Sequence, residues 1–197
     1  MRFPLIFCLI FLSAVACAGT ETLKSGVFDP PRAAPDFLLP ASTGGDFSLA
    51  GARGKLVVLA FGFTHCPQIC PMTLARLTDA ARQLGDQASE LQVLYISVDP
   101  ERDSVARLQE YLAHFNPAFI GLTGTPEQLA EVRKAYGIMA AKEIYGDGSY
   151  QVHHSSFVYL IDRQGLLRAL VPYGKSAEDI SHDLAILLRE PAEFVAP

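Results

Sequence analysis

The chain has 197 residues, of which half are hydrophobic, and it carries a formal net charge of −5. Without an N-terminal signal roughly 160–180 residues would remain, which is enough for one domain with a substantial core. Charges of both signs are spread along the chain, so the composition excludes the basic surface of a nucleic-acid-binding protein.

Residues 1–16 predict an export signal, because Arg2 precedes an apolar run that is too short to span a membrane as a helix. Small residues come directly before Cys17, as in a bacterial lipoprotein processing site. We therefore expect Cys17 to carry a lipid and the protein to be exported and membrane-anchored on the periplasmic or extracytoplasmic side. Secretion with cleavage near Ala16 or Ala18 and an uncleaved anchor are the alternatives.

The expected export signal reduces the number of cysteines that are available in the folded domain. Of the four cysteines, Cys8 would leave with the signal and Cys17 would carry the lipid. Only Cys66 and Cys70 would then remain in the folded domain. One close pair is not the disulfide framework of a small secreted scaffold, and it indicates a redox couple or a soft-metal site.

Residues 17–34 predict a flexible tether, because they contain glycine and several prolines and have little apolar periodicity. The folded domain is expected over residues 35–191. Its first element is expected to be a β-hairpin, in which a turn at 43–46 joins strands at 35–39 and 47–49.

The rest of the chain predicts strands that alternate with helices. Apolar runs between turn signals predict strands at 56–61, 91–98, 119–122, 155–161 and 166–171. Apolar residues at helical spacing predict helices at 72–84, 105–112, 126–136 and 177–188. Asp103, Thr125 and Ser176 are expected to cap the last three helices, and residues 138–148 to form a less regular excursion. This order predicts an α/β fold of the thioredoxin type with an N-terminal β-hairpin and an inserted helix.

The two remaining cysteines lie between the expected strand at 56–61 and the helix that follows it. Backbone N–H groups and the helix dipole favour a thiolate at such a junction. Cys66 and Cys70 are four residues apart, so they can close a disulfide or hold one soft ion. An iron–sulfur cluster generally needs four thiolates and structural zinc four ligands, whereas two thiolates and one imidazole serve Cu(I) or, with a further weak ligand, Cu(II). A structural disulfide is the simpler alternative.

The candidate third ligand is a histidine of the pair His153 and His154, which precedes the strand expected from residue 155. Adjacent residues of a strand point to opposite sides, so one of the two is expected to face the thiols, and the pattern leaves open which one. A polar surface turn is the alternative. His65 is interpreted as a neighbour of the cysteine loop, and His114 and His182 as surface residues on helices.

Four motifs in this order resemble the Sco/SenC family. They are the cysteine stretch at 61–71, Ser-Val-Asp-Pro-Glu-Arg-Asp at 97–103, Gly-Leu-Thr-Gly at 121–124, and His-Ser at 154–155 followed by Tyr-Leu-Ile-Asp at 159–162. The resemblance runs from about Pro35 to Leu188. It implies a membrane-tethered protein of the thioredoxin fold that binds one copper through Cys66, Cys70 and His154. It also implies a role in assembling the binuclear copper site of cytochrome c oxidase. The implied partners are the oxidase subunit that holds this site and another periplasmic copper chaperone.

Two positions depart from the family's pattern. Gln68 and His153 stand where the family usually has Asp. Both changes remove a negative charge near the expected site, which should favour thiolate over thiol and weaken the attraction for a cation. His153 could instead orient His154 or offer an extra nitrogen.

Other functions fit parts of the pattern. A thiol–disulfide reductase would use Cys66 and Cys70 as its redox-active pair, with cysteines of the oxidase subunit or another exported protein as substrates. A peroxiredoxin-like peroxidase would be expected to carry an arginine in the cysteine loop, and this loop has none. A purely structural lipoprotein is the remaining alternative. The distant histidine favours copper binding, because reductase chemistry does not require it.

Overall fold

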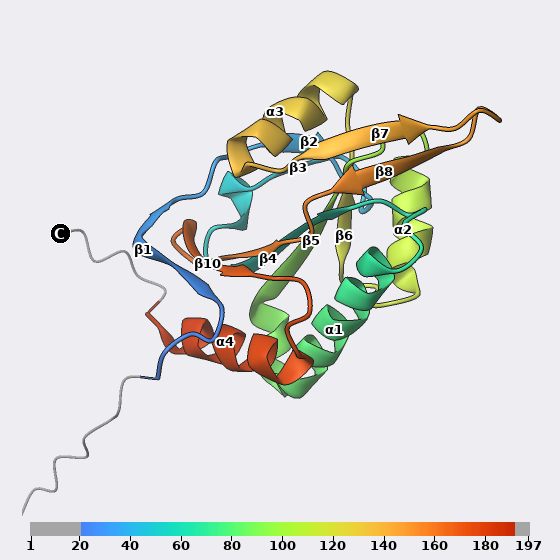
Figure 1. The fold of residues 1–197 in the computed structure, drawn as a ribbon. Helices are drawn as coiled ribbons and strands as arrows, with labels where there is room; N and C mark the ends of the chain where they lie inside the picture. Colours follow the sequence, from blue (N-terminus) through green and yellow to red (C-terminus); the bar gives the residue numbers. More distant parts are fainter. Residues whose placement is uncertain (1–20, 192–197) are drawn as a thin grey trace, which may run out of the picture.

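The computed structural model describes residues 21–191, so the expected signal at 1–16 and the expected lipid site at Cys17 lie outside the described residues. A six-stranded sheet forms the centre of the molecule (Figure 1). Its strands are β1 (Gly26–Ala33), β4 (Leu56–Gly62), β5 (Leu91–Ser97), β6 (Ile120–Leu122), β9 (Val158–Ile161) and β10 (Leu166–Val171). Across the sheet they follow the order β1-β10-β9-β4-β5-β6.

The middle of the sheet is β4, whose seven residues are all buried. It runs parallel to β5 and antiparallel to β9, and β5 runs parallel to β6. An unbroken apolar run such as Leu56–Gly62 suits a strand that is covered on both faces, since neither face then needs polar side chains. The cysteine loop therefore begins at the end of a fully buried strand, which fixes the position of its first residues.

Four helices cover this sheet. They are α1 (Ile69–Gln83), α2 (Val105–Ala113), α3 (Pro126–Tyr136) and α4 (Ala177–Arg189), with short 3-10 turns at Ala50–Ala52 and Gly85–Glu90. Figure 1 shows α1 and α4 side by side on one face of the sheet and α3 on the other. Thr125 and Ser176 cap α3 and α4 as the sequence predicts, and α3 begins with a full capping box. The expected thioredoxin-type α/β fold is confirmed.

The expected N-terminal hairpin is present. Strands β2 (Leu38–Pro40) and β3 (Asp46–Ser48) pair antiparallel. Among the described residues, no helix is both long and apolar enough to cross a membrane.

The expected tether is wrong over Gly26–Ala33, which form strand β1 at the edge of the main sheet. This strand pairs antiparallel with β10, and its register shifts between Val27 and Arg32. Most of its side chains are exposed, so no apolar alternation marks it in the sequence. The backbone of the preceding residues is also held, because the N–H groups of Lys24 and Ser25 donate to the Asp183 carboxylate on α4.

The expected excursion at 138–148 is also more regular than predicted. Strand β7 (Ala140–Ile144) pairs antiparallel with β8 (Tyr150–His154) in a separate two-stranded hairpin. The first part of the strand expected at 155–161 is extended chain, and β9 begins only at Val158. The hairpin projects from the body of the molecule next to α3 (Figure 1), and His154 is the last residue of its second strand.

Candidate metal centre

The cysteine loop joins the end of β4 to the start of α1. Cys66 lies in the loop and is half-buried, while Cys70 is the second residue of α1 and is 3% exposed. The side chain of the N-cap residue, Gln68, makes no capping hydrogen bond. Instead, the backbone N–H of Cys70 donates to the Sγ of Cys66 at 3.4 Å. The sulfur of Cys66 therefore takes the place of a capping oxygen at the positive end of the helix dipole.

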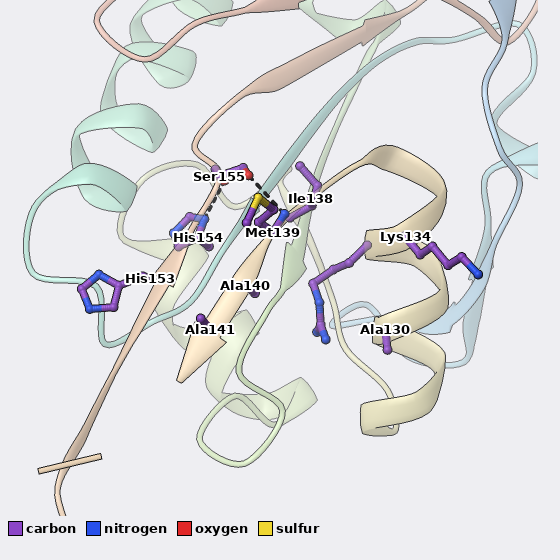
Figure 2. A pocket seen from close by; sticks show the side chains of 10 residues that line it. Ala130, Lys134, Ile138, Met139, Ala140, Ala141, His153, His154 and Ser155 are labelled. Atoms are coloured by element: carbon purple, nitrogen blue, oxygen red, sulfur yellow. Dashed lines mark hydrogen bonds between the residues drawn. The ribbon is translucent and has the colours of Figure 1, made fainter. Parts of the chain in front are cut away.

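The third side chain comes from the far end of the chain. His154 ends β8, and its Nε2 lies 3.5 Å from the Sγ of Cys70. Its Nδ1–H donates to the carbonyl oxygen of Ser155 at 2.7 Å (Figure 2). A carbonyl can only accept, so the neutral ring keeps its proton on Nδ1 and presents the lone pair of Nε2 to the sulfurs. The ring is further held edge-on against Phe63, with 5.7 Å between the centroids.

These three side chains form one cluster. The Sγ atoms of Cys66 and Cys70 and a ring nitrogen of His154 all lie within 4.8 Å of one another. Among the described residues, no other group of three or more His, Cys, Asp and Glu side chains is close enough to hold a metal ion. Both cysteines are free thiols. The structure thus brings together the two cysteines and one histidine of the pair that the sequence left open.

The other histidines lie elsewhere. His153 turns away from the thiols, and its Nε2 contacts the Glu143 carboxylate at 2.8 Å with 69% of the side chain exposed. His65 is exposed beside the loop, with Nδ1 3.1 Å from the hydroxyl of Thr64. His114 is exposed, and His182 lies next to Asp183 on α4, as expected of helix surface residues.

The two thiols differ in their acidity. A hydrogen bond from the thiol of Cys70 holds the pKa of Cys66 well below its ordinary value, and the hydrogen bond from the backbone N–H of Cys70 acts in the same direction. The same bond to Cys66, together with burial, raises the pKa of Cys70. One proton is therefore shared unequally, so that Cys66 is the thiolate and Cys70 the thiol.

The buried carboxylate of Asp103 holds the cysteine loop in place through hydrogen bonds to Thr64. Asp103 was expected to cap α2, but that cap is Ser104, whose hydroxyl accepts from the N–H of Arg107. Asp103 is fully buried and accepts from the N–H and hydroxyl of Thr64 and from the hydroxyl of Ser97. Because a buried charge is costly unless it is hydrogen-bonded, these bonds fix the loop that carries Cys66.

A second cluster holds the hairpin that carries His154. Asp99 is 4% exposed and accepts from the guanidinium of Arg102 and from the hydroxyl of Tyr150 on β8. The guanidinium also lies 3.9 Å from the centroid of the Tyr150 ring and donates to the carbonyl oxygen of that residue. The segment 97–103 therefore ties the cysteine loop and the hairpin to one strand end. Sequence reasoning missed the parts played by Arg102 and Tyr150, although the Ser97–Asp103 motif was a signal for them.

Cavities flank the cluster on two sides. A groove of about 390 Å³ runs between the cysteine loop and β8, and Cys66, Gln68 and His154 are among the residues that line it. A wider cavity of about 630 Å³ separates α3 from the hairpin (Figure 2), and His154 lines it as well. The groove gives a partner molecule access to Cys66, whereas Cys70 is covered by the protein.

Comparisons with known proteins agree on one family. The family model described as SCO1/SenC matches residues 28–189. The mitochondrial SCO2 homolog of Bos taurus is 41% identical over 150 residues, which are 70% of this chain and 56% of the relative. The chain thus spans little more than half the length of this curated relative.

Solved structures give the same result. The structure of Bradyrhizobium japonicum ScoI with copper bound has 33% identity and a TM-score of 0.73, and it covers 79% of this chain and 99% of that one. BsSco, described as a member of the Sco family of cytochrome c oxidase assembly proteins with a disulfide switch, has 26% identity and a TM-score of 0.63, with 80% and 94% covered.

Proposed function

This chain belongs to the SCO1/SenC family, and we propose that it is a membrane-tethered copper chaperone that helps to assemble the binuclear copper site of cytochrome c oxidase. It binds one copper ion through Cys66, Cys70 and His154. The observation that carries the proposal is the convergence within 4.8 Å of two sulfurs from the cysteine stretch and one ring nitrogen from a segment more than 80 residues later.

The donor set fits copper better than other metals. Two thiolates and an imidazole are soft ligands in the number that Cu(I) accepts, and a further weak ligand would complete a Cu(II) site. Structural zinc takes four protein ligands, and the described residues offer three in this cluster. The hydrogen bond from Nδ1 of His154 to Ser155 supports the proposal, because it leaves Nε2 free to coordinate.

The relatives support the same role. Copper is bound in the solved ScoI structure. The alignment with this protein covers 99% of the ScoI chain at 33% identity. BsSco belongs to a family of cytochrome c oxidase assembly proteins. These properties support an oxidase as the partner in general, and we propose the subunit that holds its copper site as the recipient and another periplasmic copper chaperone as the donor.

The exposure of the ligands suits release of the copper. Cys66 lines the groove beside β8, whereas Cys70 is covered. A recipient that offers its own thiol or imidazole from the groove would therefore displace Cys66 first. The copper leaves as cargo, and Cys70 and His154 release it after the recipient has bound it.

Thiol–disulfide exchange is a second candidate, favoured by the unequal thiols. The thiolate of Cys66 would attack a disulfide of the partner, and Cys70 would then attack the resulting mixed disulfide. The thiolate of Cys66 and the thiol of Cys70 together lose two electrons and one proton and form a disulfide, while the partner disulfide gains them and becomes one thiol and one thiolate. The same pair could thus prepare the cysteines of the oxidase subunit before copper is delivered.

The test is oxidase activity in cells that lack the gene, at low and at high added copper. Delivery of copper predicts a loss of activity under copper limitation, partly restored by added copper and fully restored by the wild-type gene. His154→Ala should fail to restore activity at low copper. Unchanged oxidase activity in the deletion strain under copper limitation would contradict delivery, and full restoration by His154→Ala would favour the reductase role.

A further inference from the structure

A buried phenol lies beneath the cysteine loop. Tyr95 belongs to β5, directly beside β4, and it is 1% exposed. Its hydroxyl donates to the carbonyl oxygen of Phe63 at 3.2 Å. The same carbonyl oxygen accepts from the backbone N–H of Cys66 at 3.3 Å. The phenol is therefore linked through one carbonyl to the loop that carries the outer thiol.

The same hydroxyl lies beside the inner thiol. A Cβ atom placed on Gly62 would be 2.2 Å from the Tyr95 hydroxyl oxygen and 2.8 Å from the Sγ of Cys70. Both atoms therefore converge on the space that glycine leaves free at the end of β4. No larger residue fits there without moving the phenol or the sulfur, so Gly62 permits their close approach.

From this geometry we propose that Tyr95 is a positioning residue for the thiol pair: its hydroxyl supports the sulfur of Cys70 while it holds the carbonyl of Phe63 above it. The inference rests on the proposed role of Cys66 and Cys70. A buried hydroxyl without a hydrogen bond is costly, and here its proton is donated to the carbonyl oxygen of Phe63 while the sulfur of Cys70 borders the same small space at Gly62. A hydroxyl dipole beside this sulfur stabilises it more when the sulfur gains negative charge.

The support is stronger for the reduced pair than for the disulfide. A thiolate or thiol sulfur accepts a hydrogen bond better than a sulfur that is bonded to another sulfur. Tyr95 should therefore shift the equilibrium of the pair toward the dithiol.

The test is the midpoint potential of the metal-free pair in Tyr95→Phe, measured in a defined thiol redox buffer. The variant keeps the ring and loses only the hydroxyl, and Phe63 keeps its bond from the N–H of Cys66. Loss of the hydroxyl beside the sulfur should shift the equilibrium constant about tenfold toward the disulfide, which is about 30 mV more negative.

Tyr111→Phe is the matched control. The ring of Tyr111 lies 6.2 Å from that of Tyr95, and its buried hydroxyl has no hydrogen-bond partner among the described residues. Its removal should leave the potential unchanged. Equal potentials for wild type and Tyr95→Phe, or equal shifts in both variants, would overturn the inference.

Copper binding separates this inference from the proposed function. In Tyr95→Phe loaded with Cu(II), the more electron-rich sulfur of Cys70 should move the sulfur-to-copper charge-transfer absorption to longer wavelength. A wild-type protein that binds no copper would contradict the proposed function, while the shift in potential of the metal-free pair would still support the role of Tyr95.

Discussion

The three candidate ligands occupy different environments, and the difference decides what each can do. Cys66 is half-buried at a groove and is held as the thiolate, Cys70 is buried as the thiol, and His154 is fixed in one tautomer by Ser155. An exposed thiolate attacks or releases first, and a covered thiol follows. This order applies both to copper transfer and to thiol exchange.

The low pKa of Cys66 predicts an unusual pH dependence of alkylation. A depressed pKa keeps the thiolate present as the pH falls, so the rate of Cys66 with iodoacetamide should change little between about pH 6 and 8. An ordinary cysteine, with a pKa of about 8.5, should slow roughly tenfold per pH unit over this range. Cys70 should react more slowly at every pH, since it is buried and its pKa is raised.

Mass spectrometry of the metal-free, reduced protein measures both rates in one sample. Cys70→Ser and Cys66→Ser are not suitable controls, because each removes the bond that sets the other pKa. The denatured wild-type chain is the control instead, and both cysteines should there show the ordinary dependence. A tenfold fall per pH unit for Cys66 in the folded protein would contradict the assignment of the thiolate.

Removing the hydrogen-bond partner of a metal ligand typically weakens metal binding roughly 10–100-fold. His154→Ala removes a ligand atom itself, so it should weaken Cu(II) binding by more than this. His153→Ala is the matched control: its side chain is 69% exposed and pairs with Glu143, so its affinity should stay near that of wild type. Competition with a chromogenic chelator measures both affinities. Equal affinity in the wild type and His154→Ala would exclude this histidine as a ligand.

Among the elements of the fold, the segment that follows β5 holds both the cysteine loop and the hairpin β7–β8 close to the sheet. Asp103 holds the cysteine loop through Thr64, and Asp99 holds β8 through Tyr150 with the help of Arg102. The hairpin β7–β8 pairs with no strand of the main sheet. Its position relative to the thiols therefore depends on side-chain contacts such as these, together with the pair of Lys142 and Glu101.

Arg102→Ala should destabilise the protein by about 2–3 kcal/mol, because it leaves the carboxylate of Asp99, which is 4% exposed, without its cation. It should also lower copper affinity, since β8 loses the guanidinium that lies on the ring of Tyr150. Denaturation of the metal-free protein in urea measures the first effect and chelator competition the second.

Lys142→Ala is the comparison for this change. Lys142 pairs with Glu101 at the surface, with side chains 34% and 62% exposed, so its loss should cost no more than about 1 kcal/mol. If both variants lost the same stability, the buried pair would not be what fastens the hairpin.

The elements that form through local sequence signals could be predicted, whereas strand β1, which forms through a long-range contact, could not. The apolar run of β4 and the caps at Thr125 and Ser176 act within a few residues, and each formed as expected. Strand β1 has mostly exposed side chains and exists through its pairing with β10, more than 130 residues away along the chain by its register of Gly26 with Leu170. Nothing within such a segment reveals its partner.

The site followed the same rule. The cysteine pair and its junction with a helix were visible in local sequence, but the choice between His153 and His154 needed either the family resemblance or the hairpin. Asp103 was taken for a helix cap because a cap needs only local sequence. Its role under the loop depends on Thr64, which lies 39 residues earlier.

At the scale of the whole molecule, the described chain begins far from the cluster. Figure 1 shows its first residues beside α4, while the hairpin β7–β8 lies on the opposite side of the sheet. The N–H groups of Lys24 and Ser25 are bonded to Asp183 on α4, so this end is fixed to the body. A lipid at the proposed Cys17 would thus be connected to the body of the molecule on the α4 side, across the sheet from the hairpin that carries His154.

Cys17→Ser should therefore abolish lipid labelling and leave copper stoichiometry unchanged. Growth with labelled palmitate checks the first expectation, and metal analysis of the purified protein checks the second. Continued labelling of the variant would contradict lipid attachment at Cys17. Loss of copper in Cys17→Ser would contradict the separation of anchor and site.

The central claim is that Cys66, Cys70 and His154 together hold one copper ion. Its most direct test is copper titration of the reduced protein, followed by X-ray absorption of the bound metal. We expect one copper per chain with two sulfur ligands and an imidazole nitrogen, and loss of tight binding in Cys66→Ser and in Cys70→Ser. Tight binding that persists in both variants, or a bound copper without sulfur ligands, would contradict it.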